Sequence, residues 1–567
     1  MDSETALSYR LSMSDQTSQT SATKGSRTRL DPWSTGAVAI AALVLLPVLS
    51  VIWFALNPEN NIWPHLLSTT LPRYLGNTVL LMLSVGAITA AVGAGAAWLV
   101  VMYRFPGHRW LQWALLLPLA VPAYVGAYAL VDFLEYAGPV QTALRGIMGW
   151  QDARDYAFPQ IRSRGAAILV LSAALYPYVY LLARAALREQ SGAGFEVARA
   201  LGVGPWGRFF RVGLPLIRPA IAAGVAVVMM ETVNDFGVVD YFAVQTLTTG
   251  IFTVWLQAGN LGGAAQIATL VLAMIVFLVT LEKLSRRRSR FFGSARQPRP
   301  VTPMRLSGGR GALAALACLL PFLAGFVLPV AVLVSHALDA REWAAPGLVK
   351  AFYHTLTTGG VAAVVTVLAG LFMVYGTRLS GHRLPVLLLP VTAIGYAAPG
   401  AVLGIGILIP LAFFDNALAD AILALTGRDP GLIFTGTAAA LVLAYCVRFF
   451  AIAQGTADAA LGRVSPSLPM AARSLGQTAG GTLRRVHVPL IRASVGSALL
   501  LVFVDCMKEL PATYWLTELL DVKALDVSVS ENDEFLGHRL PSSTGRVFGG
   551  QVLAQALMAA SKTVSAG

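Results

Sequence analysis

Eleven apolar runs of about 20 residues, separated by shorter polar segments, constrain this chain more than any other feature. A helix of that length crosses a hydrocarbon core of about 30 Å. Since 56% of the residues are hydrophobic and only 13% are charged, an ordinary soluble enzyme is excluded. We therefore predict an all-α polytopic membrane protein. Its membrane helices are expected at 35–55, 75–102, 111–131, 166–187, 216–235, 264–281, 312–336, 356–375, 385–413, 433–453 and 490–507.

The later runs repeat the earlier ones at a fixed offset of 274 positions. The loop EVARALGVGPWGRFFRVGLP at 196–215 returns as MAARSLGQTAGGTLRRVHVP at 470–489. RFPGHR at 104–109 returns as RLSGHR at 378–383, and PLIRP returns as PLIRA. One offset at three separate places indicates an internal duplication. It predicts two tandem parallel repeats of about six and five helices, related by an axis along the membrane normal.

Composition divides the chain into five segments. They are a Ser/Thr-rich tail expected to be disordered and cytoplasmic (1–30), a first membrane-spanning repeat (31–282), a basic linker (283–311), a second repeat (312–515) and a polar C-terminal tail (516–567). The Arg- and Pro-rich linker is interpreted as a solvated cytoplasmic connector, so no nucleic-acid partner is expected.

Basic residues predict the orientation. With the N-terminus inside, the inside segments carry 28 Lys and Arg, against eight in the outside segments before the last helix. Cytoplasmic loops are enriched in Lys and Arg. The N-terminus and both copies of the repeated loop are therefore expected in the cytoplasm.

The repeated loop has the features of a docking element for another protein. Small residues allow a short helix to sit in a cleft, and a glycine permits a sharp change of direction. A proline then opens the next membrane helix. The alternative is a simple interfacial helix, but the repetition disfavours it.

The pattern resembles the EAA loop of ABC importer permeases. The matching positions, which the resemblance implies couple to the ATPase, are Glu196, Ala198, Leu201, Gly202, Pro215, Ala471, Ala472, Leu475, Gly476 and Pro489. The second copy departs from the family pattern, because Met470 replaces the acidic residue and Val488 replaces the leucine.

This resemblance implies a type I importer permease in the bacterial inner membrane. The loops would insert into separate ATPase subunits, two copies in all, and a periplasmic binding protein would deliver substrate. No GxxxxGK[ST] motif occurs in the chain. We therefore expect no enzyme and no bound cofactor, with ATP and Mg used by the partner ATPase.

The stretch after the fifth helix, ETVNDFGVVDYF, and its counterpart DCMKELPATYW resemble the fused permeases of iron(III) importers. Their acids are the candidate substrate pathway: Glu231, Asp235, Asp240, Asp505 and Glu509. Acids inside a membrane indicate function, and ferric iron prefers oxygen ligands. A structural role at helix ends remains the alternative, and no metal site is assigned. Thiamine and polyamine permeases share the loop, so those substrates remain open.

The duplication predicts a twelfth helix, but the chain after Trp515 is polar instead. A short helix at 516–525, a β-like alternation at 525–529 and a second helix after Gly549 are expected there. RVFGGQVLAQAL at 546–557 resembles the N-terminus of acyl-CoA thioesterase II. The family's catalytic residues lie in a later part that has no counterpart here, so we predict a non-functional fusion fragment. A membrane-anchored thioesterase and an ion-gradient transporter are the other hypotheses.

Overall fold

The structure is a computed structural model. It describes residues 32–509, apart from 288–300, most of 339–347, 380–382, most of 393–399 and single positions at 59, 191, 429, 432 and 436. It also describes two strands beyond this range, β3 (Val527–Val529) and β4 (Phe535–Gly537), which pair antiparallel. The predicted alternation at 525–529 overlaps β3. The N-terminal tail and the two helices predicted in the C-terminal tail lie outside the described residues.

In the first half, the regular elements described between residues 32 and 287 are helices, apart from one two-residue strand. Its main elements are α2 (Pro32–Leu56), α3 (Trp63–Ser68), α4 (Leu71–Met102), β1 (Tyr103–Arg104), α5 (His108–Ala114), η1 (Leu117–Ala120), α6 (Ala123–Leu134), α7 (Pro139–Met148), α8 (Arg164–Glu189), α9 (Gly192–Ala200), α10 (Pro205–Arg208), η2 (Phe209–Gly213), α11 (Leu214–Asn234), α12 (Gly237–Tyr241), α13 (Leu247–Phe252), η3 (Thr253–Gln257) and α14 (Leu261–Arg287).

The second half repeats much of this order. Its described elements are β2 (Met304–Arg305), α15 (Gly308–Phe322), η4 (Leu323–Val327), α16 (Leu328–Ala337), α18 (Leu348–Leu379), α19 (Arg383–Thr392), α21 (Gly400–Thr426), α22 (Ala438–Gly462), α23 (Ser467–Ser474), α24 (Ala479–Thr482), η5 (Leu483–His487) and α25 (Val488–Lys508). Adding 274 to the bounds of α10, η2 and α11 gives the bounds of α24, η5 and α25. The duplication read from the sequence is therefore also a duplication of structure.

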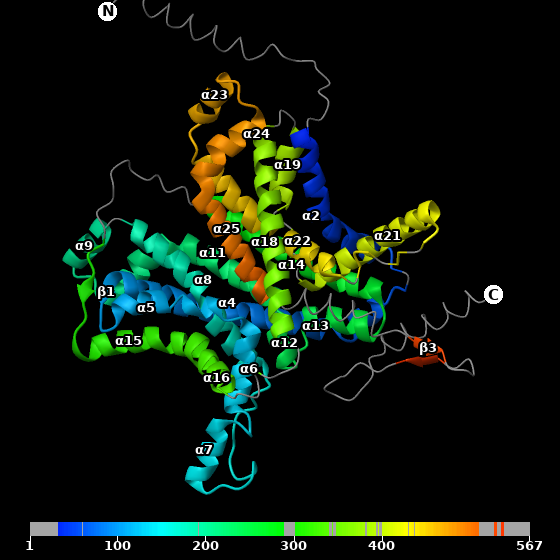
Figure 1. The fold of residues 1–567 in the computed structure, drawn as a ribbon. Helices are drawn as coiled ribbons and strands as arrows, with labels where there is room; N and C mark the ends of the chain where they lie inside the picture. The colour runs from blue at the N-terminus through cyan, green and yellow to red at the C-terminus, as the bar shows by residue number, and fades with distance from the viewer. Residues whose placement is uncertain are drawn as a thin grey trace, which may run out of the picture.

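Ten helices among the described residues are long and apolar enough to cross a bilayer, or eleven if one sharply bent pair counts as a span. This confirms the polytopic all-α fold class. In Figure 1 the loop with α9 lies at the left edge and the loop with α23 at the top, and α7 lies at the bottom.

Two of the predicted spans are wrong as single helices. The run at 111–131 is divided among α5, η1 and α6, with a bend of 95° between the flanking helices. Pro122 causes the break, because the residue before a proline is disfavoured in helical conformation and Val121 is extended there. The run at 385–413 is likewise divided between α19 and α21.

The leading helix of each half packs against the other half. α2 contacts α18, α19 and α21 of the second half as well as α14 of its own. α15 and α16 contact α4, α5 and α6, and η4 contacts α8. Glycines allow the closest approaches, since a side chain at Gly406 would collide with Pro47 and one at Gly325 with Ala173. The two halves are therefore interlocked by an exchange of helices.

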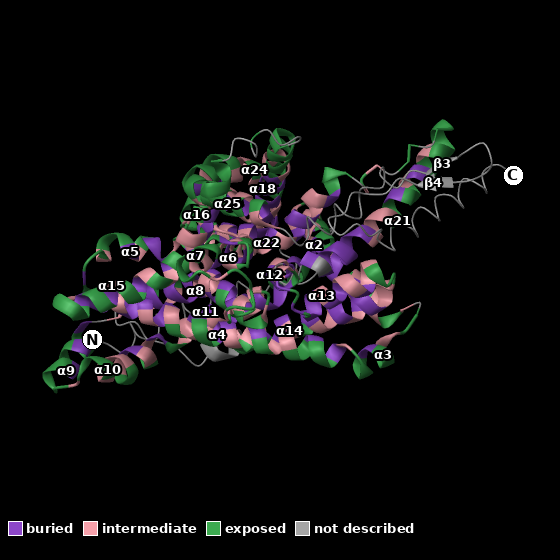
Figure 2. Cartoon of the chain, turned by 90° about the horizontal axis from the view of Figure 1, so that it is seen from below, coloured by how far each residue is buried: buried purple, intermediate pink, exposed green. Residues whose placement is uncertain are grey.

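The main buried cluster joins both halves. It contains residues of α2, α14, α21 and α22, among them Ala41, Ile267, Ile405 and Ala444, each 0% exposed. Figure 2 shows the buried residues along the centre of the molecule, whereas α9 and α10 at its edge are largely exposed. The core thus holds the halves together and leaves the repeated loops accessible.

Candidate functional site

Both repeated loops fold as a short helix, a glycine turn, a helical turn and a π-turn that runs into a long helix. Gly202 and Gly476 have φ of 78° and 82°, in the left-handed region that favours glycine. No atom lies within 4 Å of a Cβ built at either position. The turns therefore need glycine for backbone conformation and not for space.

The side chains of the loops divide into anchors and exposed residues. Ala198 and Ala472 are buried, at 8% and 9% exposure. Leu201 and Leu475, which follow in the turns, are 77% and 82% exposed. The other predicted coupling residues Glu196, Ala471, Pro215 and Pro489 are also exposed, and the two prolines lie in the first turns of α11 and α25. In each loop the short helix thus contains a buried alanine, and the leucine of the turn is exposed.

An aromatic residue of a long helix supports each loop, by different chemistry in the two halves. Trp98 packs edge-on against Phe195 and Phe209, with ring centroids 5.7 and 5.3 Å apart. A side chain at Gly213 would collide with this Trp98 ring. In the second half the Tyr375 hydroxyl donates to the Ala479 carbonyl at 2.7 Å. The two loops share a conformation but not a set of contacts.

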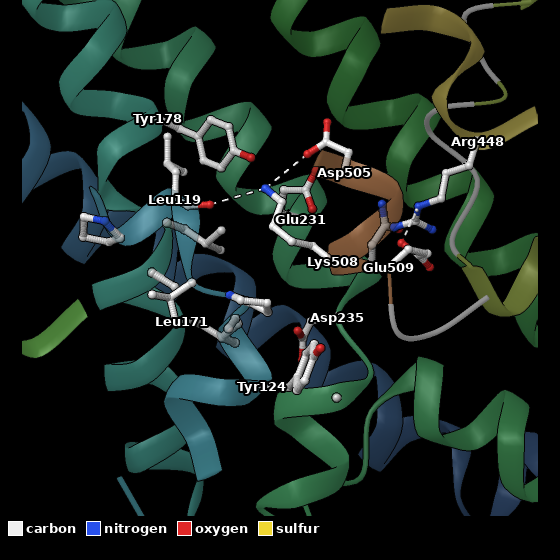
Figure 3. A pocket seen from close by; sticks show the side chains of 18 of the residues that line it. Leu119, Tyr124, Leu171, Tyr178, Glu231, Asp235, Arg448, Asp505, Lys508 and Glu509 are labelled. Carbon is white, nitrogen blue, oxygen red and sulfur yellow. Dashed lines mark hydrogen bonds and ion pairs between the residues drawn. The ribbon is translucent and has the colours of Figure 1, made fainter. Parts of the chain in front are cut away.

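A cavity of about 180 Å³ lies between the two halves. Its lining comes from η1, α6, α8, α11, α22 and α25 (Figure 3). Four of the five acids predicted for the substrate pathway line it, namely Glu231, Asp235, Asp505 and Glu509. Asp240 does not line this cavity, because it lies exposed on α12.

The cavity is lined by equivalent positions of the two repeats. At the offset of 274, the lining residues form the pairs Ala174 and Arg448, Leu175 and Phe449, Glu231 and Asp505, Asn234 and Lys508, and Asp235 and Glu509. A cavity that contains both members of five pairs lies on the axis that relates the halves. In a two-repeat transporter that axis is where a substrate path is expected.

Two cations stand among the acids of the second half. Arg448 Nε lies 2.9 Å from Glu509 Oε2, and these two side chains are only 12% and 5% exposed. Lys508 Nζ lies 3.1 Å from Asp505 Oδ1 and donates to the Leu119 carbonyl of the first half at 3.3 Å. Figure 3 shows these contacts as dashed lines. The lysine therefore bridges the two halves.

On the opposite wall Asp235 is fixed by backbone groups. Its Oδ1 accepts hydrogen bonds from the amides of Val238 and Val239, at 2.9 and 3.2 Å. The half-buried carboxyl is thereby held at the start of α12. Within the described residues no three His, Cys, Asp or Glu side chains are grouped closely enough to hold a metal ion. The cavity has oxygen ligands, but it is not a preformed chelating site.

Sequence reasoning missed Arg448, Lys508 and Asn234. The offset of 274 identifies acids that occur in both halves, whereas Arg448 corresponds to Ala174 and Lys508 corresponds to Asn234. Lys508 lies three residues after Asp505 on the same helix, and this spacing of a base and an acid could have predicted their ion pair.

Comparisons with known proteins find similarity to components of transport systems. Residues 87–290 match the family described as "Binding-protein-dependent transport system inner membrane component". The chain is 26% identical over 514 residues to the Fe(3+)-transport system permease protein FbpB 2 of Haemophilus influenzae, covering 88% of this chain and 92% of that protein.

Shorter relatives match less of the chain. The molybdenum transport system permease protein ModB of Escherichia coli is 29% identical over 225 residues, which are 37% of this chain and 95% of that protein. The sulfate transport system permease protein CysT of the same species is 25% identical, over 45% of this chain and 91% of that protein.

Among solved structures, a bacterial ABC transporter that imports alginate aligns with a TM-score of 0.37 and 17% identity, over 45% of this chain and 93% of that chain. Over most of its length, the chain is therefore similar to a permease subunit, and residues 87–290 match the inner membrane component of binding-protein-dependent transport systems.

Proposed function

We propose that this chain is the membrane-spanning permease subunit of an ABC importer, with both repeats on one polypeptide. One observation carries the proposal. Each repeated loop continues directly into a 21-residue helix, and the far ends of these two helices, α11 and α25, carry the four cavity acids. A helix of that length spans about 31 Å.

In this proposal the loops receive the motion of partner ATPase subunits in the cytoplasm. The exposed apolar side chains of the loops, such as Leu201 and Leu475, seat in the ATPase surface. Because α11 and α25 move as rigid rods, closure of the ATPase pair displaces the cavity acids and opens the cavity to one side at a time. A periplasmic binding protein delivers cargo on the opposite face.

The charge of the cavity supports a cationic cargo, with iron(III) as the first candidate. Four carboxyl groups line it, and its two cations are each already paired with one of them. An oxyanion such as sulfate, which is named for one relative, would face excess negative charge. Hard cations prefer oxygen ligands, which agrees with the iron(III) permease relative. Thiamine and polyamines are the alternative cations.

The test is reconstitution of the chain in proteoliposomes with its ATPase and binding protein. Iron(III)-loaded binding protein should stimulate ATP hydrolysis and drive iron uptake, and molybdate should drive neither. Replacement of residues 196–211 and 470–485 by flexible linkers should abolish the stimulation. Stimulation that survives loss of both loops would contradict the coupling role.

We further propose that residues 516–567 take no part in transport. A chain that ends at residue 515 should then transport as well as the full chain, and the purified full chain should not hydrolyse acyl-CoA. Measurable thioesterase activity would favour the alternative of a membrane-anchored enzyme.

A further inference from the structure

A groove of about 540 Å³ lies between α2 of the first half and α18 and α22 of the second. Its floor is buried and includes Val44, Val447 and Phe450. Its rim is exposed and includes Leu43 and Val361. The groove therefore opens on the surface, along the seam where the leading helix of the first half meets the second half.

The groove has the polarity and the depth of one leaflet of a bilayer. Apart from two threonines and Cys446, its lining side chains are alanine, valine, leucine, isoleucine and phenylalanine. On α18 the lining extends from Thr357 to Ala369, which is about 18 Å at about 1.5 Å per residue. Half of a hydrocarbon core of about 30 Å is close to this length. An extended hydrocarbon chain is the shape that fits such a groove.

Polar and aromatic side chains mark the end of the groove at Thr357 as the membrane interface. His354 and Lys350 precede Thr357 on α18 by about 5 and 10 Å. Their spacing of three and four residues places them on the face of the helix that lines the groove. Tyr353 is exposed and packs edge-on against His354, with ring centroids 6.0 Å apart. Exposed tyrosines are typical of the level of the lipid headgroups.

The two polar side chains at this level are available to a phosphate group. Neither Lys350 nor His354 is in an ion pair with another described residue. A lysine ammonium has three donors and a positive charge, and an imidazole can donate a hydrogen bond to a phosphate oxygen. The equivalent positions of the first half hold Gly76 and Leu80, so the duplication did not supply these polar side chains.

We propose that the groove binds one acyl chain of an anionic phospholipid, whose phosphate lies at Lys350 and His354. The chain fills the apolar groove, and the stem of the lysine allows its charge to reach the headgroup level. α22 runs from this end of the groove toward α23, so the lipid belongs to the leaflet away from the repeated loops. The bound chain contacts α2 on one side and α18 and α22 on the other. The lipid thus fastens the leading helix of the first half to the second half, whatever the cargo of the protein.

Cys446 provides a measurement of whether the groove is filled. It lines the groove and is partly exposed, whereas Cys318 and Cys506 are buried. The full chain is washed in an uncharged detergent and titrated with dioleoylphosphatidylglycerol or dioleoylphosphatidylcholine, and its reaction with N-ethylmaleimide is timed. The anionic lipid should slow the labelling of Cys446 saturably. The zwitterionic lipid should need at least a fivefold higher mole fraction for the same protection.

Three variants test the assignment of the two ends of the lipid. Lys350→Gln with His354→Gln should remove the difference between the two lipids, and both positions are exposed, so the fold is retained. Arg154→Gln removes an exposed cation between α7 and α8 and should leave both titrations unchanged. Val361→Trp places a large ring on the exposed rim, and it should lower the retention of either lipid in native mass spectrometry.

Equal protection of Cys446 by the two lipids in the wild type would overturn the proposal, as would the absence of saturable protection. Labelling that stays slow in the washed protein would show that another part of the chain fills the groove. Labelling that slows as the protein concentration rises would show that a second copy covers it. Either of these results would also overturn the lipid as the occupant.

Discussion

At the scale of single residues, Arg448 and Glu509 form the more buried of the two ion pairs described in the cavity. Taking two charges out of water is expensive, and only their close contact offsets this cost. With 12% and 5% of the side chains exposed, little solvent screens the pair. The net stabilisation by the pair is therefore small, whereas the loss of one partner should destabilise the protein strongly.

We predict that Arg448→Met destabilises the protein by about 3–5 kcal/mol, because Glu509 is left as a buried unpaired charge. The double variant Arg448→Met with Glu509→Leu should recover most of this loss. Thermal unfolding can be followed with a thiol-reactive dye, since Cys318 and Cys506 are buried in the folded state. A double variant as unstable as the single one would contradict this explanation.

The sequence predicted the cavity acids but not the cations between them. A fixed offset identifies what the halves share, and Glu231 and Asp505 are shared. Lys508 and Arg448 are differences between the halves, and their roles depend on side chains that meet only in space. For the same reason the sequence could not show that Lys508 reaches the Leu119 carbonyl, 389 positions away.

At the scale of elements, the repeated loops were the most predictable part of the chain. The short helices, the glycine turns and the prolines at the starts of α11 and α25 all lie where the spacing placed them. The breaks in the spans at 111–131 and 385–413 were not predicted, because apolarity runs on through them. A hydropathy pattern reports the length of an apolar segment and not its direction.

We predict that Gly476→Ala lowers ATPase stimulation and that Gly476→Asn retains most of it. Nothing blocks a Cβ at this position, so the penalty is the left-handed backbone, about 1–2 kcal/mol for alanine. Asparagine tolerates this conformation better. Stimulated hydrolysis by the two variants, measured beside Gly480→Ala as a control within α24, checks the expectation. Equal loss in both Gly476 variants would show that the turn conformation is not the cause.

At the scale of the whole molecule, the two halves share a fold, but equivalent positions on their helices are buried to different extents. In the first half Val233 of α11 is 2% exposed and belongs to the buried cluster that includes α14. Its equivalent Met507 on α25 is 40% exposed. The same face of the repeat is thus core in one half and surface in the other.

We predict a matching difference in the cost of truncation. Val233→Ala should destabilise the protein by about 1–3 kcal/mol through lost burial and the cavity that remains. Met507→Ala should cost less than Val233→Ala, since 40% of Met507 is already exposed. The unfolding midpoints of both variants are measured in one detergent and compared with that of the wild type. Similar shifts in the two variants would contradict the difference in burial between the halves.

The exchange of leading helices also governs the order in which the protein is assembled at the ribosome. α2 is synthesised first, yet most of the helices it packs against, α18, α19 and α21, emerge only after the linker. The surfaces of α4, α5 and α6 that contact α15 and α16 stay uncovered until those two helices are synthesised. Since chains fold from the N-terminus during synthesis, the first half completes its packing only once the second half is being made. A nascent chain halted at the linker therefore leaves uncovered the face of α2 that α18, α19 and α21 cover in the finished protein, and the faces of α4, α5 and α6 that α15 and α16 cover.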